Sequence, residues 1–210
     1  MRLQILVAAV ALAAASPVSA AGTDCSADVL TAIRKQLSLK AFRVEFSQPT
    51  AEGEAHMRID YMPPLRMLQT VTSPAMPGEQ QTMLVENRAF AGSGGSFEEL
   101  QPQFTQSIIA EVAEALARPS KLEGYECLGT VKYENQDLLG YRFEDRTHAL
   151  KDPSKVIART IYVDPATGLP AYNVIGPLAD GAKPLREVKY SYPTDIEIVA
   201  PANAPVQKLR

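Results

Sequence analysis

The sequence predicts an α+β fold, in which two long helices pack against one face of a large antiparallel sheet of about ten strands. Three observations lead to this prediction. Residues 29–37 have helical periodicity and run through a four-residue link into residues 42–48, where apolar and polar residues alternate. A second amphipathic helix interrupts a long series of short alternating segments. No βαβ rhythm appears in their order, which disfavours a parallel sheet.

Residues 1–21 have the organisation of a secretory signal peptide. They contain one positive charge at Arg2, an apolar run over residues 3–15, a break at Pro17, and the small residues Ser19, Ala20 and Ala21. The run is shorter than the ~20 residues of a membrane span, and no later segment is long and apolar enough to serve as one. We therefore expect cleavage near Ala20 or Ala21, a periplasmic location, no transmembrane segment, and a single domain over residues 22–210.

The charge balance argues against a polyanion-binding protein. The formal net charge is −3, and loss of residues 1–21, which contain one Arg and no acid, changes it to −4. Basic residues are scattered among acids, so they do not form the clustered stripe that nucleic-acid binding requires. We expect no nucleic-acid partner and a monomeric protein.

The chain has two cysteines, Cys25 and Cys127. In an oxidising compartment an isolated pair is most simply a disulfide, which here would close a loop of about 100 residues and contribute about 4.7 kcal/mol in the chain-entropy model. Redox or metal chemistry is the alternative. The chain has no Cys-x-x-Cys, and His56 and His148 lack ligand spacing, so we expect no metal and no cofactor. Acylation of Cys25 is disfavoured because Asp24 stands where lipoprotein processing needs a small uncharged residue.

After the opening helix and strand, the first half of the chain consists of short strands and turns. Residues 54–61 alternate between apolar and polar side chains, and Pro63 and Pro64 end that strand. Further strands are expected at residues 65–71, 81–85 and 88–91, with a loop at 73–78 and a hairpin turn at 86–87. Residues 92–96, rich in Gly and Ser, are expected to form a flexible loop.

The second helix is expected between Thr105 and Arg118. Its apolar face is formed by Ile108, Ile109, Val112 and Leu116, and Pro119 stops it. Six more strands are expected at residues 126–133, 138–143, 157–163, 171–175, 187–192 and 196–199. Residues 164–168 place Pro and Gly where a hairpin turn uses them.

Three stretches of the chain resemble a known superfamily. The opening helix runs into Phe42-x-x-x-Phe46-x-Gln48, a strand followed by Pro63 comes next, and residues 161–170 read Ile-Tyr-Val-Asp-Pro-Ala-Thr-Gly-Leu-Pro. With a terminal strand ending at Pro201, this order resembles the outer-membrane lipoprotein carrier superfamily, which comprises the periplasmic carrier, its outer-membrane receptor and their mycobacterial lipid-binding relatives. The resemblance spans nearly the whole mature chain in element order.

The resemblance implies a curved half-barrel of about ten or eleven strands, with helices covering its concave face over an apolar cavity for acyl chains. It implies lipid or lipoprotein acyl chains as partners, with an envelope membrane protein as a further partner, and no chemistry. Strand and helix periodicity supplies candidates for the cavity wall, although the same residues could pack as an ordinary core. The candidates are Phe42, Val44, Phe46, Met57, Ile59, Tyr61, Met67, Met83, Val85, Phe90, Ile108, Ile109, Val112, Leu116, Tyr141, Phe143, Ile161 and Val163.

One position departs from the superfamily pattern. The classical carrier has an Arg directly before the strand-ending Pro, where it clasps the lid, and this chain has Met62 before Pro63. Arg66 is nearby but in a different register, so the latch role is not carried over to it. The resemblance therefore predicts the fold and a lipid-like cavity more than lipoprotein delivery.

Two other functional classes fit parts of the sequence. Residues 91–95 form a variant of the hydrolase nucleophile elbow around Ser93, followed by Asp145 and His148, but an elbow needs a strand-to-helix turn that is not expected here. Glu98 and Glu99 are expected in a loop or a first helical turn rather than as an acid/base pair. A protein-binding sensor or regulator of the cell envelope could use the same curved sheet, and this alternative stays open.

Overall fold

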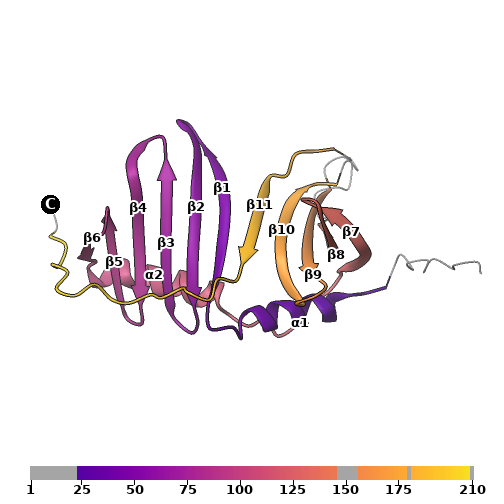
Figure 1. The fold of residues 1–210 in the computed structure, drawn as a ribbon, viewed down its shortest axis with the longest axis horizontal. Coiled ribbons are helices and arrows are strands. Elements are labelled where there is room, and N and C mark those ends of the chain that lie inside the picture. The colour runs from indigo at the N-terminus through magenta and orange to yellow at the C-terminus, as the bar shows by residue number, and fades with distance from the viewer. Residues whose placement is uncertain (1–22, 146–155, 179–180, 209–210) are drawn as a thin grey trace, which may run out of the picture.

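The structure, a computed structural model, describes residues 23–145, 156–178 and 181–208, so the predicted signal peptide lies outside the described residues. Two helices and eleven strands occur in this part of the chain (Figure 1). All eleven strands belong to one sheet, and every neighbouring pair is antiparallel. The predicted α+β class, with helices on one face of a large antiparallel sheet, is confirmed.

The helices are α1 (Ser26–Gln36) and α2 (Pro102–Ala115). Between them lie β1 (Phe42–Thr50), β2 (Gly53–Met62), β3 (Arg66–Ser73), β4 (Met76–Val85), β5 (Arg88–Ser93) and β6 (Ser96–Glu99). After α2 come β7 (Glu126–Tyr133), β8 (Gln136–Asp145), β9 (Ile157–Asp164), β10 (Leu169–Pro177) and β11 (Arg186–Ser191). Strand β6 was not predicted, and the flexible loop expected at 92–96 is instead a tight hairpin turn between β5 and β6.

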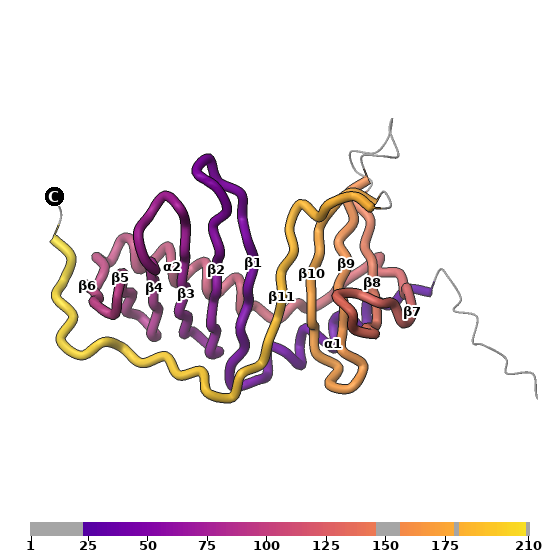
Figure 2. The backbone as a smooth tube through the Cα atoms, turned by 45° about the horizontal axis from the view of Figure 1, so that its top comes forward, coloured from indigo at the N-terminus to yellow at the C-terminus, as the bar shows by residue number. Residues whose placement is uncertain are grey.

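Each series of strands is a meander, and the first and last strands of the chain join the two. The order across the sheet is β6-β5-β4-β3-β2-β1-β11-β10-β9-β8-β7. Strand β1 pairs with β11 from Arg43, opposite Ser191, to Phe46, opposite Val188. Figures 1 and 2 show that the sheet is curved, most strongly over β7 to β10. The two halves of the chain therefore form one continuous surface.

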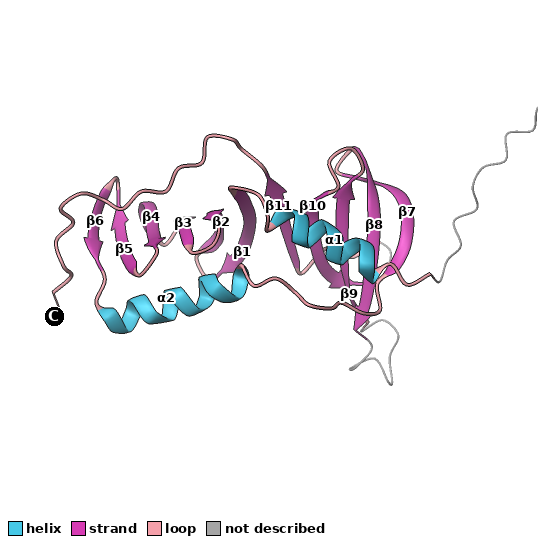
Figure 3. Cartoon of the chain, turned by 90° about the horizontal axis from the view of Figure 1, so that it is seen from below, coloured by secondary structure: helices cyan, strands magenta, loops and turns pink. Residues whose placement is uncertain are grey.

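Both helices pack on the same face of the sheet, called the helix face below. Pro102 stands in the first turn of α2, where a missing N–H costs nothing, and Asp28, Arg34 and Lys35 suit the dipole of α1. Helix α2 covers β3 to β5 by packing Val112 with Met67, Leu84 and Ala89. Helix α1 covers β8 and β9 by packing Val29 and Ala32 with Tyr141, Ile161 and Val163. Figure 3 shows the helices running across the strands, each under its own half of the sheet.

The chain after β11 corrects one prediction. Residues 196–199 were expected to be a strand, but they form an extended segment outside the sheet. Alternation still buries Ile196 and Ile198, which pack with Met83 and Phe90 on the face opposite the helices. Residues 192–208, which follow β11, are called the C-terminal tail. Between residues 196 and 199 the tail contacts side chains of the sheet and does not complete a ladder of backbone hydrogen bonds.

Backbone and side-chain hydrogen bonds fix the tail to the sheet. The backbone N–H of Glu99 donates to the Pro205 carbonyl and that of Gln207 to the Glu99 carbonyl, both at 2.8 Å, so the tail pairs with the edge strand β6. Arg66 donates to the Ile198 carbonyl at 3.4 Å and to Glu86 at 3.1 Å. Coverage of an edge strand removes a site where other chains could pair.

The tail gives a matched pair of stability variants. Ile198 is 1% exposed and its neighbour Val199 is 60% exposed. We expect Ile198→Ala to lower the free energy of unfolding by about 2–4 kcal/mol, because it opens a cavity against β4 and β5. Val199→Ala should change it by less than about 0.5 kcal/mol. Urea denaturation measures both, and equal effects would contradict the packing of the tail.

Candidate functional site

A cavity of about 410 Å³ lies on the helix face between the two helices. It is called the inner cavity, and its floor is formed by β1, β2, β9, β10 and β11. The end of α1, the end of α2 and the link between α2 and β7 form its cover. Its lining residues are Ile33, Gln36, Phe42, Val44, Phe46, Ile59, Tyr61, Ala115, Leu122, Tyr125, Arg159, Ile161, Pro170, Asn173, Ile175, Arg186, Val188 and Tyr190.

Strand register explains why the floor is mainly apolar. Directly opposed residues on neighbouring strands share a face. One such row runs across the sheet through Met57, Phe46, Val188, Asn173, Ile161 and Tyr141. A second runs through Ile59, Val44 and Tyr190. All but Asn173 in these rows present a largely apolar side chain to the space under the helices.

The structure gathers one group of the predicted residues in the inner cavity and places the others elsewhere. The group in the cavity is Phe42, Val44, Phe46, Ile59, Tyr61 and Ile161. The residues in the core between α2 and the sheet are Met67, Ile108, Ile109, Val112 and Leu116. Those under α1 are Tyr141 and Val163. Phe143 contacts the Tyr125 ring at 5.7 Å between centroids, and Met57 lines a separate groove described below.

Three predicted residues lie on the face of the sheet opposite the inner cavity. Met83, Val85 and Phe90 point away from the helices and pack against the C-terminal tail. Their strand neighbours Leu84 and Ala89 are the ones that face α2. Because side chains alternate along a strand, a shift of one residue moves the whole set to the other face.

Sequence reasoning missed part of the cavity wall. Val188 and Tyr190 alternate in a segment that was predicted as a strand, so their period of two could have marked them. Ile175 has the same periodicity in β10. Leu122 and Tyr125 belong to the irregular link after α2, where no periodicity exists to find them.

Polar groups in the inner cavity cluster around Tyr190. Burial raises the pKa of its hydroxyl, and a hydrogen bond from Asn173 and the charges of Arg159 and Arg186 oppose that rise. Burial also raises the pKa of the Tyr125 hydroxyl, again opposed by Arg159. The Asn173 Oδ1 atom is buried and has no hydrogen-bond partner among the described residues. These groups form one polar cluster in a mainly apolar wall.

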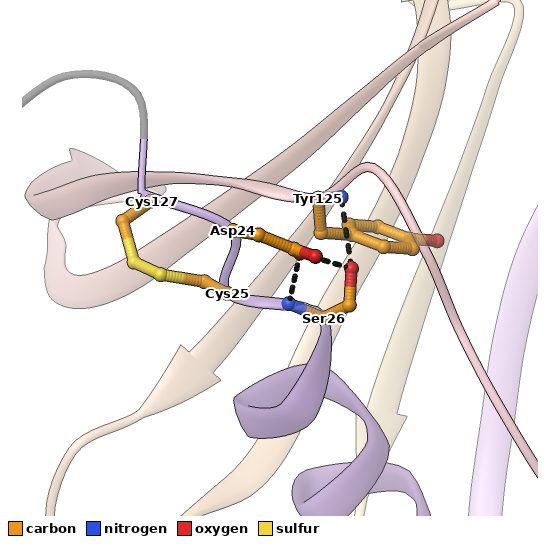
Figure 4. The surroundings of a disulfide bond; sticks show 5 residues. All are labelled: Asp24, Cys25, Ser26, Tyr125 and Cys127. Carbon is orange, nitrogen blue, oxygen red and sulfur yellow. Dashed lines mark hydrogen bonds between the residues drawn. A yellow bond between two sulfur atoms is a disulfide. The ribbon is translucent and has the colours of Figure 1, made fainter.

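The cover of the cavity is anchored covalently at the start of α1. Cys25 and Cys127 form a disulfide with their Cα atoms 5.5 Å apart. Figure 4 shows the surrounding bonds: the Ser26 hydroxyl donates to Asp24 at 2.6 Å and accepts from the Tyr125 N–H at 3.1 Å. These Ser26 bonds hold the pKa of Asp24 below its usual range. Tyr125, a cavity residue, is thereby tied to the first turn of α1.

A larger groove of about 950 Å³ adjoins the inner cavity where β1 and β11 separate beyond the Phe46–Val188 pair. Its wall includes Glu45, His56 and Lys183 and is much more polar than that of the inner cavity. Phe46 and Arg186 line both spaces. The Arg186 guanidinium carbon lies 4.3 Å from the centre of the Phe46 ring. This stacked pair separates the apolar cavity from the polar groove.

The structure does not assemble the hydrolase alternative. Ser93 ends β5 in a hairpin, with no helix after it, and Asp145 ends β8 in the other half of the sheet. His148 lies outside the described residues. Glu99 accepts two hydrogen bonds from Arg88, which lower its pKa, so it is an ion-pair partner at the surface.

Among the described residues, one cluster of side chains has the composition of a metal site. One group, Cys25, Asp28 and Cys127, has ligand atoms within 4.8 Å of one another, but both sulfurs are joined in the disulfide. Neither helix in this part of the chain has the length and apolar character of a membrane-spanning helix.

No protein-family model matches the chain, and no curated protein sequence matches it significantly. Solved structures do match, and two of them cover most of this chain. An uncharacterised conserved protein from Thermus thermophilus has 14% sequence identity and a TM-score of 0.47, and the match covers 87% of this chain and 98% of that chain. LprF from Mycobacterium bovis has 9% identity and a TM-score of 0.49, with 85% of this chain and 97% of that chain covered.

The disulfide yields a stability prediction. The bonded cysteines are 102 residues apart, so the loop they close is long. We expect the double variant Cys25→Ser, Cys127→Ser to lower the free energy of unfolding by about 2–5 kcal/mol. Wild-type protein unfolded in reductant should match the variant, and the variant should not respond to reductant. Equal unfolding midpoints for oxidised wild type and the variant would contradict this role.

Proposed function

We propose that the protein binds an acyl chain of a lipid or lipoprotein in the inner cavity and carries out no chemistry on it. The observation that supports this most directly is the apolar floor of a 410 Å³ space left between two helices. Small-molecule sites are typically about 300–1,000 Å³, mostly apolar, with a few placed polar groups. The inner cavity has this character. A disulfide supports a site of action outside the cytoplasm, and we place it in the periplasm.

Transfer of an acyl chain from water into the apolar cavity can supply the binding free energy without specific polar contacts. Each methylene group moved from water into an apolar site contributes about 0.8 kcal/mol. A long acyl chain therefore gains enough to offset the cost of its own ordering. Because hydrophobic attraction is not directional, the site could accept chains that differ in length or unsaturation.

Hydrogen bonds join the parts of the cover to one another and to the sheet. Arg34 of α1 donates to the Pro119 carbonyl at 3.0 Å and to the Ser120 carbonyl at 3.0 Å, which couples α1 to the α2–β7 link. Gln36, at the cavity end of α1, donates to the Tyr192 hydroxyl at 3.3 Å. Replacing one such hydrogen bond with hydrogen bonds to water costs a net free energy of only about 1 kcal/mol. Loading would proceed by displacement of this end of α1, with its first turn held by the disulfide.

Bound lipid should be detectable directly. Protein expressed with its leader in a periplasm-containing host should show adducts in gentle native mass spectrometry, and organic extraction should release acyl lipids. The delipidated protein should bind a fluorescent fatty acid. A protein free of lipid that also ignores fatty acids and lipoproteins would overturn the proposal, and co-purification of a protein partner in place of lipid would favour the sensor alternative.

A matched pair of variants tests the location of the site. Val188 lies on the cavity floor, whereas Val174 pairs with Glu187 and faces the other side of the sheet. We expect Val188→Trp to lower fatty-acid affinity at least about tenfold, because the indole fills the inner cavity. Val174→Trp should leave it within about twofold. Circular dichroism checks folding of both, and equal affinities in two folded variants would contradict this location.

A further inference from the structure

We propose that the mouth of the inner cavity binds an anionic head group, a carboxylate or a phosphate, through Arg159 and Arg186. This inference rests on the proposed function and adds the chemical class of the ligand. On three adjacent strands, Ile175 lies directly opposite Arg159 on one side and Arg186 on the other. The two arginines thus stand in one row across the helix face, about 10 Å apart at their backbones.

The arginine row lies next to the apolar rows of the cavity floor. One repeat along the strands, two residues or about 7 Å, separates it from the row of Ile161, Asn173 and Val188. It also stands close to the ends of the strands, because β11 begins at Arg186 and β9 begins two residues before Arg159. An acyl chain on the apolar rows would therefore bring its head group to the two guanidinium groups.

Both arginines are accessible to a ligand and lack an acidic partner among the described residues. Their side chains are exposed while they line the inner cavity. Neither takes part in the ion pairs found in this part of the chain. Glu187, the chain neighbour of Arg186, points to the opposite face and accepts a hydrogen bond from the Tyr133 hydroxyl. By contrast, Arg43, Arg88 and Arg142 each form an ion pair with a carboxylate.

The surrounding polar groups hold the site in place. Arg186 stacks on Phe46, which restrains its guanidinium at the junction of the cavity and the groove. Arg159 lies beside the Tyr125 hydroxyl and close to Tyr190. The Asn173 Oδ1, which has no partner among the described residues, is an acceptor suited to a hydroxyl group near the anion. Guanidinium groups recognise carboxylates and phosphates by two parallel hydrogen bonds, so either anion fits.

The test compares ligands that differ in the head group. Delipidated full-length mature protein is titrated with oleate and oleyl alcohol, which share a chain, and with phosphatidylglycerol and diacylglycerol, which differ in the phosphate head group, at one low ionic strength. We expect the wild type to prefer oleate over the alcohol, or phosphatidylglycerol over diacylglycerol, by about tenfold, the effect of a hydrogen bond to a charged group. The preferred anionic ligand identifies a carboxylate or a phosphate.

Variants of the two arginines test whether these residues cause the preference for an anionic head group. Arg159→Gln and Arg186→Gln should each lose most of the preference for the anion while keeping affinity for oleyl alcohol within about twofold. Lys132→Gln, which removes one exposed charge from β7, is the matched control and should behave as wild type. Equal binding of anionic and neutral ligands, or an unchanged preference in both arginine variants, would overturn the head-group site alone. Failure of every lipid to bind would overturn the proposed function with it.

Discussion

The helix face of the sheet is wider than its two helices can cover, and the candidate site follows from that mismatch. Eleven strands about 4.8 Å apart span about 48 Å along the sheet. The 11 residues of α1 and 14 residues of α2 give lengths of about 16 and 21 Å. Because both helices run across the strands and each stays on its own half of the sheet, neither crosses the pairing of β1 with β11 (Figure 3). The α2–β7 link passes over this region, and the inner cavity lies beneath it.

Both faces of the sheet are covered at β4, by α2 on one side and by the C-terminal tail on the other. On β4 three consecutive residues, Met83, Leu84 and Val85, are apolar, because α2 covers one face and the C-terminal tail covers the other. Alternation could not tell which of them faces the helices. In the tail, buried apolar residues alternate with exposed ones at Ile196 and Ile198, yet this segment has no strand partner among the described residues. Packing against β4 and β5 is enough to bury these two side chains. Apolar periodicity reports burial on one side and does not report a hydrogen-bonded ladder.

Sequence reasoning worked where local chemistry decided the structure. Residues close in the chain determine three features that the structure has. These are the change from helix to strand before Phe42, the turn after Asp164 and the alternation of side chains along β1. The cavity wall depends on which strands become neighbours, and the pairing of β1 with β11 joins residues far apart in sequence. The alignment of Arg159, Ile175 and Arg186 also arises only from pairing. No pattern within one strand could reveal it.

Met62 shows how a departure from a family pattern can be explained by tertiary contacts. It lies opposite Arg66 in the β2–β3 ladder and packs in the cluster that holds the C-terminal tail. Arg66 donates to the tail carbonyl of Ile198. This corner of the sheet therefore fastens the tail on the face opposite the helices, which leaves α1 without a latch there. Helix α1 is held by the Cys25–Cys127 disulfide at its first turn, by the packing of Val29 and Ala32 on the sheet, and by hydrogen bonds from Lys35 and Gln36 in its last turn. Only non-covalent contacts hold the last turn of α1 to the sheet, and Gln36 in that turn borders the inner cavity.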